Sequence, residues 1–112
     1  MDDAARAYID AIDPAHRPLF DRLHNIIVDA HPDVAITFAY QMPTYVVGGR
    51  RIHLATWRHG VSIYGWDRAH DGGFLERHPS VLSGRSTIRL RPTDASAIDD
   101  DELRGLLLPA LA

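Results

Sequence analysis

The chain has 112 residues, which is the length of one domain with a modest core. It contains no cysteine and no lysine, so disulfides, thiolate metal sites, cysteine nucleophiles and lysine Schiff bases are excluded. Its 12 basic residues are all arginine, and 15 acidic residues give a formal net charge of −3, which argues against broad non-specific nucleic-acid binding.

Two helices are predicted in the first third of the chain. Apolar side chains recur at helical spacing over residues 3–12 and form a longer amphipathic stripe over residues 14–31. Pro14 suits the first turn of the second helix, and Pro32 ends it.

The apolar period then changes from helical spacing to alternation, which predicts β-strands. A break is expected at Pro43 and a hairpin turn at Gly48-Gly49. The expected strands cover residues 34–39, 45–47, 51–57, 61–66 and 86–91.

A weak helix is expected over residues 74–81, and a last helix over residues 100–111, where Pro109 frays or kinks the end. Strands joined by short turns are antiparallel. The sequence therefore predicts a single α+β domain over residues 1–112: an antiparallel sheet of about five strands with N-terminal and C-terminal helices packed on one face.

Common catalytic motifs are missing from the sequence, which has no G-x-S-x-G, H-E-x-x-H, Walker A or G-x-G-x-x-G. His24 and His31 lie on one predicted helix, separated by about 10 Å along its axis, so they cannot share one metal ion. We therefore expect a non-enzymatic protein whose histidines are solvated or locally hydrogen-bonded.

The first predicted helix carries a row of carboxylates, Asp3, Asp10 and Asp13, with no cation expected on that face. Oxygen ligands suit hard ions such as iron or calcium, with low affinity here because each position supplies only one or two ligands. The alternative is an ordinary polar helix face, with acidic side chains near the helix N-terminus.

The sheet face away from the helices is the other candidate site. Aromatic and arginine side chains there would suit a planar or anionic small molecule, a partner protein or a second copy of the chain. Cross-strand aromatic pairing that only stabilises the sheet is the alternative. By strand alternation, this face is predicted to carry Tyr45, Arg51, His53, Trp57, Tyr64, Trp66 and Arg89.

Four segments between Tyr8 and about Leu108 carry a resemblance to a known family. They are YIDAIDPAHRPLFDRLHNIIVDAHPD, YQMPTY, VGGRRIHLATWRHGVSIY and GFLERHPSVLSGRSTIRLRP. Together they resemble the YdhG-like family, small bacterial proteins of largely unknown function that include proteins described as frataxin-like intracellular iron chaperones.

The resemblance implies an α+β fold and a role in delivering iron for cofactor assembly, with Asp3, Asp10 and Asp13 as ligands. It adds Gln41, which precedes MPTY, to the candidate ligand-binding residues. Positive groups at the hairpin and the last strand belong to the family pattern, and they imply a sheet surface that faces an anion.

Two functions are therefore expected: iron binding through the acidic helix face, or binding of an anionic small molecule or protein partner by the outer sheet face. The N-terminus has no secretory signal, and no apolar run approaches the ~18 residues of a membrane span. We expect a cytoplasmic protein that does not enter membranes, with nucleic acid as the least favoured ligand.

Overall fold

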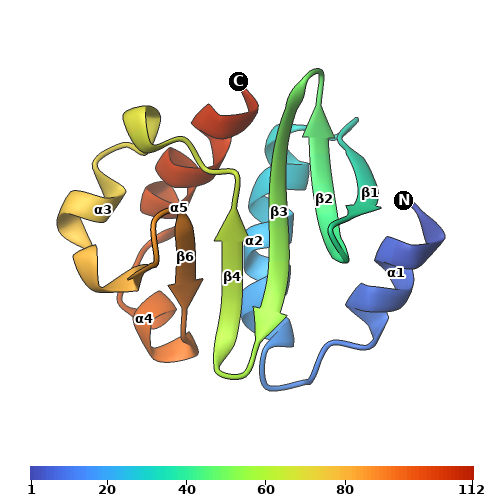
Figure 1. The fold of residues 1–112 in the computed structure, drawn as a ribbon, viewed down its shortest axis with the longest axis horizontal. Helices are drawn as coiled ribbons and strands as arrows, with labels where there is room; N and C mark the ends of the chain where they lie inside the picture. The colour runs from blue at the N-terminus through green and yellow to red at the C-terminus, as the bar shows by residue number, and fades with distance from the viewer.

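The computed structural model describes residues 1–112, which form an antiparallel six-stranded sheet flanked by helices (Figure 1). The sheet confirms the predicted α+β class and has slightly more strands than expected, because the two-residue β5 was not predicted. The strand order is β1-β2-β3-β4-β6-β5. The strands are β1 (Ala35–Ala39), β2 (Met42–Val47), β3 (Arg50–Trp57), β4 (Gly60–Tyr64), β5 (Leu82–Ser83) and β6 (Thr87–Leu90).

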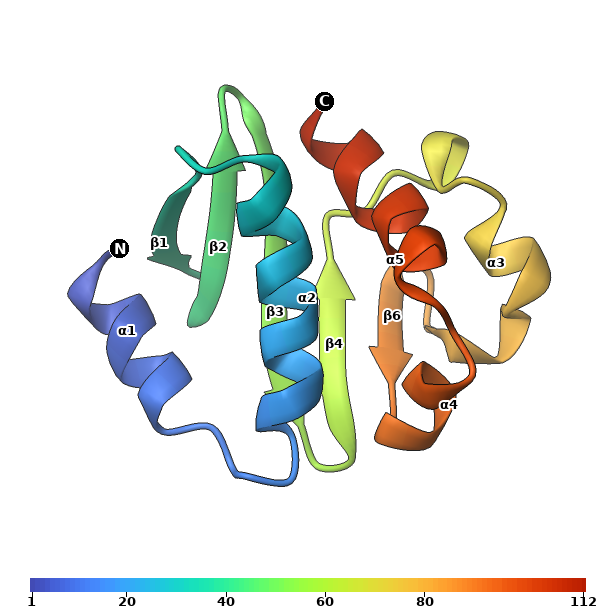
Figure 2. The same cartoon turned by 180° about the vertical axis from the view of Figure 1, so that it is seen from behind.

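Three helices, α1 (Asp3–Asp10), α2 (Arg17–Ala30) and α5 (Asp100–Leu107), lie on one side of the sheet. Figure 2 shows α2 and α5 in front of the strands, with α1 beside β1 and β2. The short helices α3 (Phe74–Arg77) and α4 (Pro92–Ser96) lie around the β6 end of the sheet. The opposite face of β3 and β4 is left uncovered.

Prolines set several boundaries. α2 begins at Arg17, three residues later than expected, because Asp13 holds the preceding turn: its carboxylate accepts a hydrogen bond from the Ala15 amide at 2.8 Å. Pro18 occupies the first turn of α2 in place of Pro14. At the C-terminus the chain tightens after α5 into a 3-10 helix, Leu108–Leu111, which contains Pro109 near its start.

The break expected at Pro43 is wrong, because this residue lies inside β2 opposite Phe38. Ala39 and Met42 close the preceding turn, so Pro43 occupies a position that does not hydrogen-bond to β1. Pairing with β3 starts one residue later, at Thr44. The missing proline N–H therefore removes no hydrogen bond from the sheet.

The core lies between the inner face of the sheet and the helices. One buried row crosses three strands, where Leu54 pairs with Ile63 and Ile63 pairs with Ile88. The helices contribute Phe20, Leu23, Ile27, Leu103, Leu106 and Leu107, all fully buried. None of the helices combines the length and apolar character that crossing a lipid bilayer would require.

Candidate functional site

The uncovered sheet face holds five of the residues predicted for it: Arg51, His53, Trp57, Tyr64 and Arg89. His53 pairs with Tyr64 across β3 and β4, and Trp57 follows on the same face of β3. Arg89 lies on β6, where it pairs with Ser62 of β4. The two arginines are exposed, while the rings of the other three residues are half-buried.

Tyr45 does not belong to this face. It pairs with Ile36 and Ile52, and all three residues are buried on the inner, helix-facing side of the sheet. Its hydroxyl lies 2.7 Å from Nδ1 of His24 on α2. Strand alternation does not determine which face of the sheet Tyr45 occupies, because Tyr45, Val46 and Val47 are three consecutive bulky residues with no polar residue between them.

Trp66 is also absent from the outer face, because β4 ends at Tyr64 and the strand alternation stops there. Gly65 follows with φ of +85°, a left-handed conformation that turns the chain. The indole of Trp66 packs into the core with only 8% of its surface exposed, and its Nε1 donates to the carbonyl of Ser86 at 2.8 Å.

Gln41 lies in the two-residue turn that joins β1 to β2. Both turn residues have positive φ, 52° at Tyr40 and 60° at Gln41, although neither is glycine. A two-residue hairpin of this kind normally uses Asn-Gly or Gly-Gly, so the backbone is strained here. The turn leaves Tyr40 81% exposed, and its ring meets the edge of His53 with centroids 5.6 Å apart.

His53 is held by its neighbours on the outer face. Its Nδ1 lies 2.7 Å from the hydroxyl of Thr44, a buried residue on the adjacent strand. Burial, and then the positive charge of Arg51, lower the pKa of His53. The neutral imidazole is therefore favoured at this position.

A second part of the outer face gathers around Trp57. The guanidinium carbons of Arg89 and Arg91 lie 5.0 and 5.6 Å from the centroid of the Trp57 ring, both within the range of cation–π contacts. The ring of His59 meets the same indole edge-on at 5.2 Å. Two positive charges therefore share one aromatic surface.

Gly60 allows the strands around this cluster to approach closely. It pairs with Trp57 at the start of β4, and a Cβ atom at this position would collide with the carbonyl oxygen of Leu90 on β6. Only glycine fits between the two strands. The close approach holds Trp57 of β3 near the arginines at the end of β6.

The cluster borders a cleft of about 350 Å³ between the sheet and the segment that leads into β5. Neither Arg89 nor Arg91 forms an ion pair, because every ion pair in the structure involves other residues. The Trp57 Nε1 is buried and has no acceptor in the protein. The residues that line the cleft are Trp57, Ser80, Val81, Leu82, Ser83, Arg89, Arg91 and Asp94.

Arg91, Ser80 and Ser83 were missed as candidate residues. Arg91 follows Arg89 by two positions, so the alternation of the last strand was a usable signal for it. The two serines carried no such signal, because their place depends on how the segment before β5 folds against β6.

The predicted carboxylate row is not gathered into a metal centre, since no group of three or more His, Cys, Asp or Glu side chains could hold a metal ion. Asp13 lies beyond the end of α1 and is engaged with the Ala15 amide. Asp10 borders a cavity together with Arg6 and Arg17, so this face does carry cations, contrary to expectation.

A comparison of the chain with protein-family models, curated proteins and solved structures finds no match. The resemblance to the YdhG-like family stays a prediction.

Proposed function

We propose that this protein binds an anionic small molecule in the cleft beside Trp57. The observation that carries this proposal is the pair of guanidinium groups, Arg89 and Arg91, placed over one indole, neither of them in an ion pair with a carboxylate. Arginine binds carboxylate and phosphate groups through paired, charge-assisted hydrogen bonds. An anion at this position would meet both guanidinium groups.

The rest of the cleft supports a ligand with oxygen atoms. Ser80 and Ser83 line the cleft, and a serine hydroxyl can donate to an anion or accept from a hydroxylated ligand. The Trp57 N–H has no acceptor in the protein, and a buried donor without an acceptor is unusual in a folded protein.

Asp94 limits which anions fit. Its carboxylate lines the cleft, and Oδ2 accepts a hydrogen bond from the Arg91 backbone amide at 2.9 Å. The cleft therefore carries two positive charges and one negative charge. We infer that it favours a single compact anionic group, with a neutral or hydroxylated remainder facing Asp94.

Iron binding, the function that the family resemblance implies, has less geometric support. Asp3, Asp10 and Asp13 belong to no group of side chains that could hold a metal ion, and Asp10 borders a cavity together with Arg6 and Arg17. The anion cleft is the better-supported site because its charged groups do converge on one space.

Tryptophan fluorescence tests the proposal directly, since the chain has only two tryptophans. We expect inorganic phosphate or glycolate to produce a saturable change that sodium chloride at the same ionic strength does not produce. Trp57→Phe should abolish the change, because Trp66 is buried elsewhere in the core. Absence of a saturable change with both anions would refute the proposal.

Charge variants locate the binding. Arg89→Gln and Arg91→Gln should each weaken binding by about tenfold, the effect of one charge-assisted contact. Arg85→Gln is the matched control, because it removes the same charge from an exposed turn position outside the cleft. Asp94→Asn should tighten binding. Equal effects of the three arginine substitutions would indicate non-specific attraction and contradict the proposal.

A further inference from the structure

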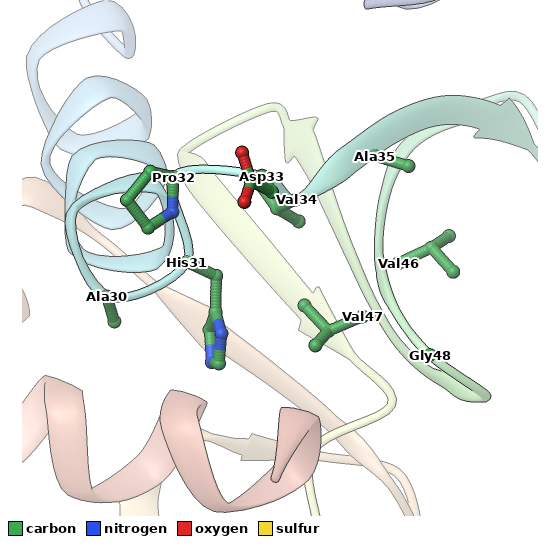
Figure 3. Close-up of a pocket in the computed structure, with 9 residues that line it drawn as sticks. All are labelled: Ala30, His31, Pro32, Asp33, Val34, Ala35, Val46, Val47 and Gly48. Atoms are coloured by element: carbon green, nitrogen blue, oxygen red, sulfur yellow. The ribbon is translucent and has the colours of Figure 1, made fainter.

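The largest cavity in the structure, about 570 Å³, lies where the chain leaves α2 and enters β1 (Figure 3). It is separate from the anion cleft and lies at the other end of the strand order, beside β1 and β2. Its volume is in the range of small-molecule sites. The cavity is lined by Ala30, His31, Pro32, Asp33, Val34, Ala35, Val46, Val47 and Gly48.

One side of this cavity is apolar. Val34 and Val47 are half-buried, and Figure 3 shows them on the sheet side of the hollow. The imidazole of His31 extends into the hollow from the end of α2, across from Val47. These surfaces offer an aromatic or branched aliphatic group a place to pack against the valines and the ring.

The other side of the cavity is electronegative because α2 ends here. The C-terminus of a helix carries a partial negative charge, and the last turn of α2 contains no basic residue to offset it. After the His31 amide, which bonds to the Ile27 carbonyl, the next residue is Pro32, which has no N–H to offer the later carbonyls.

Carboxylates add to this charge. Asp33 lines the cavity, and Asp29 lies in the last turn of α2. Asp33 belongs to no ion pair. The basic residue opposite Val47 in the strand register, Arg50, borders a different cavity together with Asp67. Asp33 is the only carboxylate among the lining residues and no arginine is among them, so the lining itself carries a negative charge.

We propose that this cavity binds a small organic cation: a protonated amine attached to an aromatic or branched aliphatic body. The ammonium group would lie near Asp33 and the free carbonyls at the end of α2, and the apolar body would pack against Val34, Val47 and His31. An ammonium group has hydrogen-bond donors only, which matches the acceptors that a helix C-terminus presents.

This site is independent of the proposed anion cleft, because it selects the opposite charge with different residues. Loss of either site leaves the other intact. The two proposals can therefore fail separately, and the same protein sample tests both.

Backbone amide NMR with three matched probes tests the inference. Phenethylamine is cationic at neutral pH, 2-phenylethanol is its neutral counterpart and 3-phenylpropionate is anionic. We expect saturable shifts for phenethylamine at the amides of residues 31–35 and 46–48, excluding Pro32, with at least fivefold weaker binding of the alcohol and none of the carboxylate. Equal binding of all three probes, or no saturable shift with the amine, would overturn the inference.

Two variants separate the charge from the apolar surface. Asp33→Asn should weaken amine binding by about fivefold and leave the alcohol unaffected, whereas Val47→Ala should weaken both. Asp10→Asn is the charge-matched control, since this residue borders another cavity. Each variant is compared by its spectrum in the absence of probe, which shows whether it is folded. Unchanged amine binding by a folded Asp33→Asn variant would contradict the proposed role of the carboxylate.

Discussion

The hydroxyl of Tyr45 lies 2.7 Å from Nδ1 of His24, and this contact joins the inner face of the sheet to α2. Tyr45 is fully buried, and the two rings meet edge-on with centroids 5.6 Å apart. A buried phenol requires a hydrogen-bond partner, and α2 supplies it. The pair therefore has a structural role.

Removal of this hydroxyl tests that role. Tyr45→Phe leaves the His24 nitrogen without its partner, so we expect the free energy of unfolding to fall by about 1–2 kcal/mol. Tyr64→Phe, on the outer face, should change it by less than about 0.5 kcal/mol. Urea unfolding of the two variants measures the difference. Equal losses would show that the Tyr45–His24 bond contributes nothing specific.

The same pair predicts how stability depends on pH. Burial lowers the pKa of His24 in the folded state, an effect that the charge of Asp21 partly offsets. The unfolded chain, with an ordinary histidine pKa of about 6.5, then binds more protons below neutrality than the folded protein does. We expect stability to be retained at pH 7–8 and to fall as the pH decreases toward the folded-state pKa. His53 shifts in the same direction.

Chemical denaturation at several pH values between 8 and 5 measures this dependence. His24→Gln should flatten the slope, because the amide does not titrate and can still bond to the Tyr45 hydroxyl. His59→Gln, at an exposed turn, is the matched control for the loss of one histidine. A wild-type slope in the His24→Gln variant would assign the pH dependence to other groups.

The strained turn between β1 and β2 gives a third prediction. Gln41→Gly should stabilise the protein by about 1 kcal/mol, because glycine adopts a positive φ without steric cost. Gln41→Ala keeps the steric conflict and should have little effect. Thermal unfolding distinguishes the two. A loss of stability in the glycine variant would show that contacts of the Gln41 side chain outweigh the backbone strain.

The iron hypothesis can be tested at Asp3 and Asp10 of α1 and at Asp13 in the turn that follows it. If they bind iron, an Asp3/Asp10/Asp13→Asn triple variant should lose most of the heat of ferrous iron binding in anaerobic calorimetry. Carboxylate oxygens are the ligands that would be lost. Equally weak binding by the wild type and the variant would end the iron hypothesis for this chain.

The sequence predicted β3 and β4 well because apolar and polar side chains alternate along them, and only one register then buries the apolar side chains. Ile52, Leu54 and Ile63 lie on the inner face as the pattern required. The short β2 offered too few residues to fix its phase, so Tyr45 was placed on the wrong face. The prediction for Trp66 was wrong because the chain turns at Gly65 through a positive φ, which the alternation of side chains does not reveal.

The anion cleft could not be predicted because the residues that form it lie far apart in the chain. Trp57 and Arg89 meet because β4 pairs with both β3 and β6, a strand order that local periodicity does not determine. The cavity at the end of α2 was unpredictable for a similar reason, since its wall comes from β2. Sequence patterns identified suitable residue types, whereas their convergence required the fold.

Gly60 makes the anion cleft vulnerable to a change at a residue with no binding chemistry of its own. Any side chain there would force β6 away from β4 and carry Arg89 and Arg91 away from Trp57. Natural variants that keep the cleft are therefore expected to keep glycine at this position, even where the ligand-facing side chains have changed. Related proteins that keep the site are therefore expected to share the close approach of β4 and β6 at this glycine as well as the two arginines.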